Sequence, residues 1–316
     1  QSGHFNFAEK RTFLLWVYIV IAHHPSRSAT ALGEYGLTSP AELRAWNDAA
    51  PDIAVGMEGA PGHQAAQLLE EAAKLGYPEW VFSRGAYGRG YPTLGGFDQM
   101  TARVGGFWDS MLAEGRRWWI TANSDSHRHY TQGGIDFWPG EYSKTYVHAI
   151  KEHADILDGI RHGRVFVTTG DLVSELYVTV SQASAQAGMG GILTAVTDEL
   201  VEVVIRFKDP DSANAAGRNP RVARVDLIVG EVTGPGQDPH RDEHESVRVA
   251  ARFTAEDWRD EEGYTVIRHS LKLDEPSYLR VRGTNLVAQL EPEPDEPGED
   301  PWSDLWFYSN PVFVRR

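Results

Sequence analysis

Side chains of the kinds that bind metal ions stand directly after two apolar stretches of this sequence. Asp125 and His127 follow the stretch RWWITA, and His23 and His24 follow the run FLLWVYIVIA. Carboxylate oxygens and imidazole nitrogens are ligands that suit Zn²⁺, Mn²⁺ or Fe²⁺. Each pair taken alone is also typical of a polar strand end or a solvated turn. The position of each pair in the fold must therefore decide between metal binding and these ordinary roles.

Three further residues stand in similar surroundings. Glu58 ends a short apolar stretch in GMEGAPGH, where its carboxylate could bind a metal or orient another ligand. His63 opens a helical stretch, so it could lie near an anion at a helix N-terminus. His4, in GHFN, is typical of a loop when considered alone. If the apolar stretches are strands of one barrel, their carboxyl ends meet on one face and bring these side chains together.

The elements that would position these residues alternate in type up to about Gly170. The pattern predicts short strands separated by helices and one Gly-rich loop, with Ser39 as the N-cap of the first helix. Such alternation is typical of α/β units around a parallel sheet. The predicted strands are 16–22, 53–57, 117–122 and 165–168, the helices are 40–49, 62–75, 97–113 and 148–161, and the loop is 84–96.

After Asp171 the apolar residues recur with period two. Seven short strands with turn-rich connections predict an antiparallel β-sandwich. We therefore expect two domains, a barrel part at 1–172 and a β-sandwich accessory domain at 173–316. The predicted strands are 175–181, 201–207, 224–229, 246–253, 265–273, 278–282 and 312–315.

The order of the motifs in the first 170 residues resembles the PHP superfamily of metal-dependent phosphoesterases. The motifs are GHFN, AHHP, GMEGAPGHQ, ANSDSH and a closing GRVFVTTG, and they are most similar to the carbaryl-hydrolase-like branch of these metallohydrolases. The resemblance implies an α/β fold with a distorted (β/α)7 barrel that holds two or three divalent metals, Zn, Mn or Fe. The family's opening His-x-His motif has no counterpart upstream of His4, so this chain is expected to begin about halfway through the barrel.

The resemblance also implies roles for individual residues. His4, His24, Asp125 and His127 match the family's metal ligands, and the last two are expected to act in catalysis. The second-tier candidates are His23, Glu58 and His63. Arginines in the predicted loops could bind a substrate phosphate, although solvated charge is an equally ordinary role for them; these are Arg84, Arg89 and Arg128.

The reaction implied is hydrolysis of a small-molecule ester, most simply a phosphate ester, by a metal-activated hydroxide. Two alternatives stay open. The same chemistry serves a carboxylic or carbamate ester, and a relic barrel could belong to a non-catalytic binding protein. The β domain shows no catalytic grouping, and contact with a carbohydrate or another protein through it is left open.

Composition excludes several other classes of function. The 316 residues carry a formal net charge of −15 and no block of Lys or Arg, which argues against binding nucleic acid. There is no cysteine, so a disulfide, a zinc–thiolate site and a thiol nucleophile are excluded. The longest apolar run has ten residues, too few to span a bilayer. We expect a soluble protein, and the compartment, cytoplasmic or secreted and periplasmic, stays open.

Overall fold

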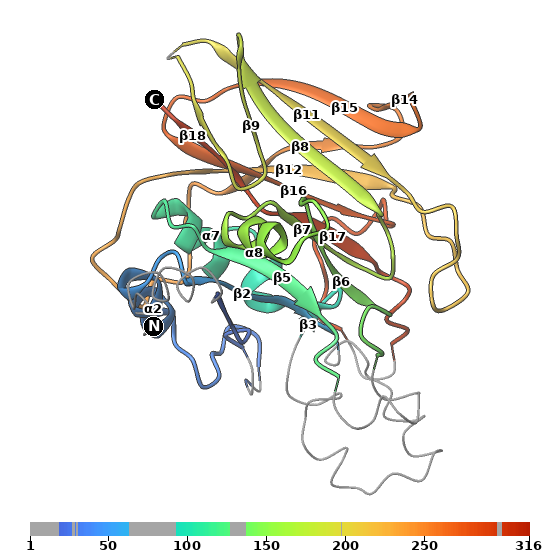
Figure 1. The fold of residues 1–316 in the computed structure, drawn as a ribbon, viewed down its shortest axis with the longest axis horizontal. Coiled ribbons are helices and arrows are strands. Elements are labelled where there is room, and N and C mark those ends of the chain that lie inside the picture. The colour runs from blue at the N-terminus through green and yellow to red at the C-terminus, as the bar shows by residue number, and fades with distance from the viewer. Residues whose placement is uncertain are drawn as a thin grey trace, which may run out of the picture.

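The chain is mostly β. The structure, a computed structural model, describes residues 19–26, 29, 31–62, 93–126, 137–196, 198–295 and 299–316. Of these residues, 39% lie in strands and 12% in helices. The strands form two large sheets and two small ones, and none of them is closed. Figure 1 shows the large sheets stacked above the small parallel sheet and its helices.

The first large sheet has five antiparallel strands in the order β14-β15-β11-β8-β9. Its sequence alternates as predicted, because one face of each strand is buried and the other meets solvent. In β11, for example, Val203 and Ile205 are buried while Glu202 is exposed. The strands are β8 (Glu175–Gln182), β9 (Ala185–Gly188), β11 (Leu200–Lys208), β14 (Arg259–Glu261) and β15 (Tyr264–Lys272).

The second large sheet has eight strands, six of them in the order β10-β18-β16-β17-β7-β6, with β12 paired to β16 and β13 paired to β12. Its inner face shares one hydrophobic core with the five-stranded sheet, through residues such as Leu227, Leu279 and Val281. The strands are β6 (Ser143–Val147), β7 (Val165–Thr169), β10 (Ile192–Thr194), β12 (Arg224–Glu231), β13 (Arg248–Phe253), β16 (Ser277–Thr284), β17 (Trp306–Ser309) and β18 (Val312–Arg315).

The first third of the described chain supplies a parallel sheet, a hairpin and helices. The predicted helix at 40–49 is confirmed as α2 (Pro40–Ala49), and the side chain of Ser39 accepts a hydrogen bond from the Glu42 amide as its N-cap. The parallel sheet has the order β1-β2-β5, and the hairpin pairs β3 with β4. The remaining elements are β1 (Val20–Ala22), β2 (Ala54–Pro61), β3 (Thr93–Leu94), β4 (Phe97–Asp98), α6 (Gln99–Ala102), α7 (Phe107–Ala113), β5 (Trp119–Asn123) and α8 (His153–Arg161).

The expected (β/α)7 barrel is wrong. Of the strands assigned to it, only β1, β2 and β5 pair in parallel; β7 pairs antiparallel with both β6 and β17 and so belongs to the eight-stranded sheet. All five residues of β7 are buried. A central antiparallel strand that is covered on both faces has the same continuous apolar run as a barrel strand, which is why the pattern misled.

The helix predicted at 97–113 is also wrong as a single element. The chain forms β4, then α6, and a second helix, α7, begins only at Phe107. Gly105 separates the two helices with a φ of +76°. A glycine takes this left-handed conformation readily, and it interrupts the helical backbone. The helix predicted at 62–75 and the loop predicted at 84–96 fall almost wholly outside the described residues.

The eight-stranded sheet runs across the boundary that we expected near residue 172. Strands β6 and β7 precede it, whereas β17, the partner of β7, follows it by more than a hundred residues. A second hydrophobic core likewise mixes the two parts of the chain, with Trp119 from β5 packed near Phe313 from β18. The parallel sheet is thus attached to the eight-stranded sheet by this packing, and by hydrogen bonds from Asn310 to Ile120 and from Thr145 to Ala122.

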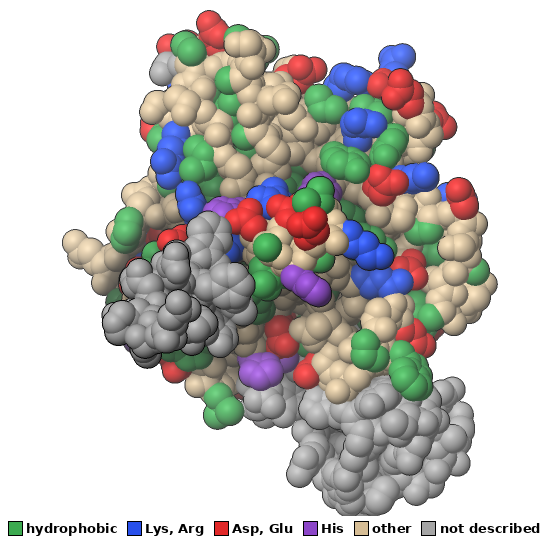
Figure 2. All heavy atoms as spheres, viewed as in Figure 1, with side chains coloured by type: hydrophobic (Ala, Val, Ile, Leu, Met, Phe, Trp, Pro, Cys, Tyr) green, Lys and Arg blue, Asp and Glu red, His purple; other side chains and the backbone are tan. Residues whose placement is uncertain are grey.

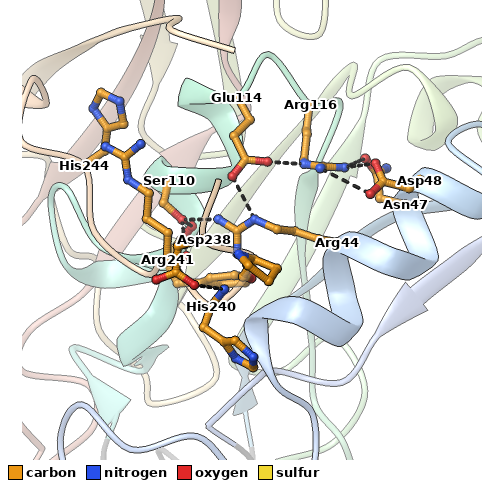
Figure 3. Close-up of polar contacts among 12 residues, drawn as sticks. Arg44, Asn47, Asp48, Ser110, Glu114, Arg116, Asp238, His240, Arg241 and His244 are labelled. Atoms are coloured by element: carbon orange, nitrogen blue, oxygen red, sulfur yellow. Dashed lines mark hydrogen bonds and ion pairs between the residues drawn. The ribbon is translucent and has the colours of Figure 1, made fainter. Parts of the chain in front are cut away.

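A polar network fastens the loop between β12 and β13 onto α2 and α7 (Figure 3). The buried guanidinium of Arg44 donates to Glu114 at 2.8 Å and to the carbonyl of Pro239 at 3.0 Å. Ser110, on α7, donates to the carbonyl of Arg241 at 3.2 Å. These contacts satisfy buried polar groups on both sides of the junction, as buried groups require.

A fully buried ion pair joins α7 to β16. Arg280 donates to both carboxylate oxygens of Asp109, at 2.8 and 2.7 Å, and the Tyr278 hydroxyl donates to the same carboxylate at 2.8 Å. All three side chains are buried. Two parallel hydrogen bonds from one guanidinium fix geometry as well as charge, so this pair sets how α7 lies on the sheet.

Two further observations concern the surface and the helices. Acidic and basic side chains are interspersed on the face that Figure 2 shows. Within the ranges described, no helix is long and apolar enough to cross a membrane.

We predict that Asp109→Ala lowers the free energy of unfolding by about 3–5 kcal/mol, because it leaves the Arg280 charge buried without a partner. The measurement is urea unfolding followed by tryptophan fluorescence. Arg268→Ala is the matched control: it breaks the solvent-exposed pair with Glu261, and should leave the unfolding midpoint nearly unchanged. Equal effects of the two substitutions would contradict the structural role given to the buried pair.

Candidate metal centre

Parallel pairing brings the ends of three strands together at one place. In β1 and β2, Ala22 pairs with Met57, so the residues that follow β1 lie beside Glu58. On its other side β2 pairs with β5, and the register of this pair shifts between Glu58 and Ala60. The polar residues after β1 and at the end of β5 therefore converge on Glu58.

Close approach of β2 and β5 depends on a glycine. A Cβ atom at Gly56 would lie 2.1 Å from the carbonyl oxygen of Trp119, which no side chain tolerates. The other edge of β5 is held by side chains instead of a strand. The side chain of Asn310 accepts a hydrogen bond from the Ile120 amide at 3.0 Å and donates one to the Ile120 carbonyl at 3.2 Å. The Thr145 hydroxyl likewise accepts from the Ala122 amide and donates to the Ala122 carbonyl.

The Glu58 carboxylate is the centre of the site. Its Oε2 lies 2.9 Å from Nδ1 of His23 and 3.0 Å from Nδ1 of His24, and it also accepts from the His24 amide at 3.3 Å. Its Oε1 accepts from the Asn123 side-chain amide at 2.9 Å. An ionised carboxylate can only accept, so each Nδ1 directs a hydrogen at Glu58, and the Nε2 atom lies on the far side of each ring.

The two histidines differ in their exposure. The His23 side chain is 53% exposed, whereas that of His24 is wholly buried. Nε2 of His24 has no hydrogen-bond partner among the described residues. A buried imidazole nitrogen without a partner is costly, and a metal ion is one group that would satisfy it.

The geometry suits a divalent cation in either of two ways. The ligand atoms of His23, His24 and Glu58 lie within 4.8 Å of one another, the one group of this kind among the described residues. Two adjacent ligands of an octahedral cation with bonds of about 2.1 Å lie about 3.0 Å apart, close to the separations found here. Alternatively Glu58 orients His24, whose Nε2 then binds the cation, an arrangement common for metal-binding histidines.

Electrostatics keep the Glu58 carboxylate ionised. Burial raises the pKa of Glu58, but the hydrogen bond and charge of His24, with the hydrogen bonds of His23 and Asn123, outweigh burial and lower that pKa to about 2. The Glu58 carboxylate is therefore ionised at pH values well above 2. A negative charge beside two imidazoles favours a cation.

A second carboxylate, Asp98, lies near this group and was missed from the sequence. It is fully buried, accepts from the Ser26 hydroxyl, and caps α6 by accepting from the Met100 amide at 2.8 Å. Burial raises the pKa of Asp98, against the lowering effects of His24, Ser26 and Met100. The residues FDQM predict only the start of a helix, so no local pattern indicated that Asp98 lies near the candidate metal ligands.

An open cavity of about 420 Å³ lies beside the site. Asn123 links the two, because it donates to Glu58 and also lines the cavity. The rest of the lining comes from the segment after β5 and from β6. A small molecule could therefore lie next to the carboxylate.

The structure places His24, a predicted metal ligand, beside His23 and Glu58, which the sequence indicated only as second-tier candidates. Asp125 follows β5 with a φ of +44°, and it is outside the three-residue group. The other candidates fall outside the described residues, so the structure says nothing of them: His4, His63, Arg84, Arg89, His127 and Arg128.

Comparisons with protein-family models, with curated proteins and with solved structures find no match to this chain.

We predict that the ionised Glu58 carboxylate stabilises the folded protein, and that this stabilisation is lost as the pH falls. Its pKa of about 2 is below the ordinary 4.5, so its contribution is fully present above pH 4.5 and is lost as the pH falls toward 2. That contribution is about 3 kcal/mol. The difference in the free energy of unfolding between wild type and Glu58→Gln, both without metal, should shrink from pH 6 to pH 3.

Glu202→Gln serves as the control, because Glu202 is exposed on β11. Its difference from wild type should hardly change over the same pH range. A Glu58 difference that stays constant with pH would show that the histidines do not stabilise the ionised carboxylate.

Proposed function

We propose that this protein is a metal-dependent hydrolase, most simply a phosphoesterase, whose metal binds at the group formed by His23, His24 and Glu58. The observation that carries the proposal is the buried Nε2 of His24, which has no partner within the described part of the chain, beside a carboxylate that is ionised. Two imidazoles and one carboxylate form a donor set suited to Zn²⁺, Mn²⁺ or Fe²⁺.

The chain's own residues divide the work of binding and orientation. Glu58 fixes the ring orientation of both histidines through their Nδ1 atoms, and Asn123 holds the other carboxylate oxygen in place. Burial of His24 keeps water away from one side of the site. When bound, a divalent cation supplies Lewis acidity, which acidifies water and polarises the ester.

The likeness of the AHHP and ANSDSH motifs to those of PHP phosphoesterases supports the reaction, although the described residues form no (β/α) barrel. The candidate ligands Asp125, His4 and His127 remain proposals for further metals of the same site. An ester substrate would enter from the cavity that Asn123 lines.

The test is metal content and hydrolysis measured on the same preparations. We expect wild type to bind at least one Mn²⁺ or Zn²⁺ per chain in equilibrium dialysis, and to hydrolyse p-nitrophenyl phosphate. His24→Ala should weaken metal binding by about 100-fold or more, since it removes a direct ligand; Glu58→Gln should weaken it by about 10–100-fold. Activity should fall in parallel.

His153→Ala is the matched control, because His153 is exposed at the start of α8 and lies in no metal-binding group of the described residues. It should leave both measurements unchanged. Hydrolysis of p-nitrophenyl acetate in place of the phosphate would assign a carboxylic ester substrate. Metal-free protein with no hydrolysis of either would overturn the proposal and favour a binding protein.

A further inference from the structure

The chain between β1 and α2 carries His23 and His24, and its described residues form no strand or helix. We call the described part of residues 23–36 the histidine segment. No sheet or helix fixes its position, yet the His24 side chain is wholly buried and its Nδ1 lies 3.0 Å from the Glu58 carboxylate. Side chains from another part of the chain hold this segment in place.

Two adjacent side chains at the junction of β4 and α6, Asp98 and Gln99, make these contacts. Both are fully buried. The Asp98 carboxylate accepts a hydrogen bond from the hydroxyl of Ser26, which follows His24 by two residues and is itself 1% exposed. Buried polar groups are stable only when they are paired, so Asp98 and Ser26 constrain each other.

The Gln99 side chain binds three backbone groups farther along the histidine segment. Its Oε1 accepts from the Gly33 amide at 2.5 Å, and its Nε2 donates to the carbonyls of Ala31 and Glu34 at 3.3 and 3.5 Å. Gly33 has a φ of +84°, a conformation that glycine adopts readily in a tight turn. One planar amide group therefore fixes this turn through both of its polar atoms.

The junction that carries these two side chains is fixed relative to Glu58. Both β4 and α6 lie against β2, the strand that contains Glu58. The β3–β4 hairpin is fastened in turn by Asp295, whose carboxylate accepts hydrogen bonds from the amides of Gly95 and Gly96 at 2.8 and 3.0 Å. The junction is therefore a firm support that holds the histidine segment in one position beside β2.

We propose that Asp98 and Gln99 are positioning residues of the metal centre, which hold the histidine segment so that the buried Nε2 of His24 is in place to bind the cation. This rests on the proposed function, which it deepens by naming residues that set the metal affinity without binding the metal. Neither side chain belongs to the group of candidate ligands. Loss of a residue that orients a metal-binding histidine commonly weakens metal binding by about 10–100-fold.

The test is equilibrium dialysis with Zn²⁺ and Mn²⁺, with the unfolding midpoint measured on the same preparations. Asp98→Ala and Gln99→Ala should each weaken metal binding about tenfold. Asp98→Asn keeps one acceptor oxygen at this position, so it should retain more of the affinity than Asp98→Ala. Metal affinity equal to that of wild type in both alanine variants would overturn the inference.

Ser26→Ala removes the other side of the Asp98 contact and leaves the junction of β4 and α6 intact. It should weaken metal binding about threefold to tenfold, and its effect should be less than additive with that of Asp98→Ala, because the two substitutions remove the same interaction. Fully additive effects would show that Asp98 acts on the metal independently of Ser26, and would overturn its positioning role.

Asn214→Ala is the matched control for loss of stability. Asn214 is also a buried amide that binds three backbone groups, those of Gly170, Ala216 and Arg218, and none of these belongs to the histidine segment. The substitution should lower the unfolding midpoint about as much as Gln99→Ala and leave metal affinity unchanged. An equal loss of metal affinity in both would show that lower stability alone weakens metal binding, and would overturn the inference.

A measurement without metal separates this inference from the proposed function. At pH 6, Glu58→Gln should cost less stability in the Ser26→Ala background than in wild type, because His24 is then held less firmly against Glu58. If this coupling is found while no metal binds, the positioning of His24 stands and the hydrolase proposal is wrong. If metal binds with the same affinity in wild type and in all the positioning variants, the metal centre stands and the inference is wrong.

Discussion

One carboxylate, on β2, accepts hydrogen bonds from three side chains that come from the ends of the two neighbouring strands, β1 and β5. Glu58 lies on β2, the two histidines follow β1, and Asn123 ends β5. These partners meet only if the parallel register of all three strands is kept, and Gly56 is the residue that lets β2 and β5 approach closely enough. The ionised carboxylate and the ring orientations follow from this convergence, as does the position of the His24 Nε2, which has no partner in the described part of the chain.

The large sheets determine where that convergence occurs. Asn310, between β17 and β18, completes the open edge of β5 by hydrogen bonding to both backbone groups of Ile120. Pairing of β7 with β17 and the buried pair between Asp109 and Arg280 attach the same region to the eight-stranded sheet. Residues distant in sequence thus stabilise the strand whose end forms both the candidate metal centre and the cavity beside it.

Local signals predicted the elements better than their arrangement. Ser39 before Pro40 identified a helix start, and period two located strands such as β8 and β11, because capping and one-sided burial are encoded over a few residues. The barrel was wrong because the buried run of β7 is the same for a parallel and a central antiparallel strand. In the site, AHHP indicated His24, whereas the central place of Glu58 depends on the register between three strands, which single-sequence patterns do not specify.

The central claim is that a divalent cation binds through His24 beside the ionised carboxylate of Glu58. The most direct measurement is X-ray absorption at the metal edge of Zn²⁺- or Mn²⁺-loaded protein, compared with His24→Ala. The account predicts a first shell of nitrogen and oxygen at about 2.0–2.2 Å, with scattering from imidazole rings that diminishes in the variant. A first shell without imidazole, or one that is identical in the variant, would contradict it.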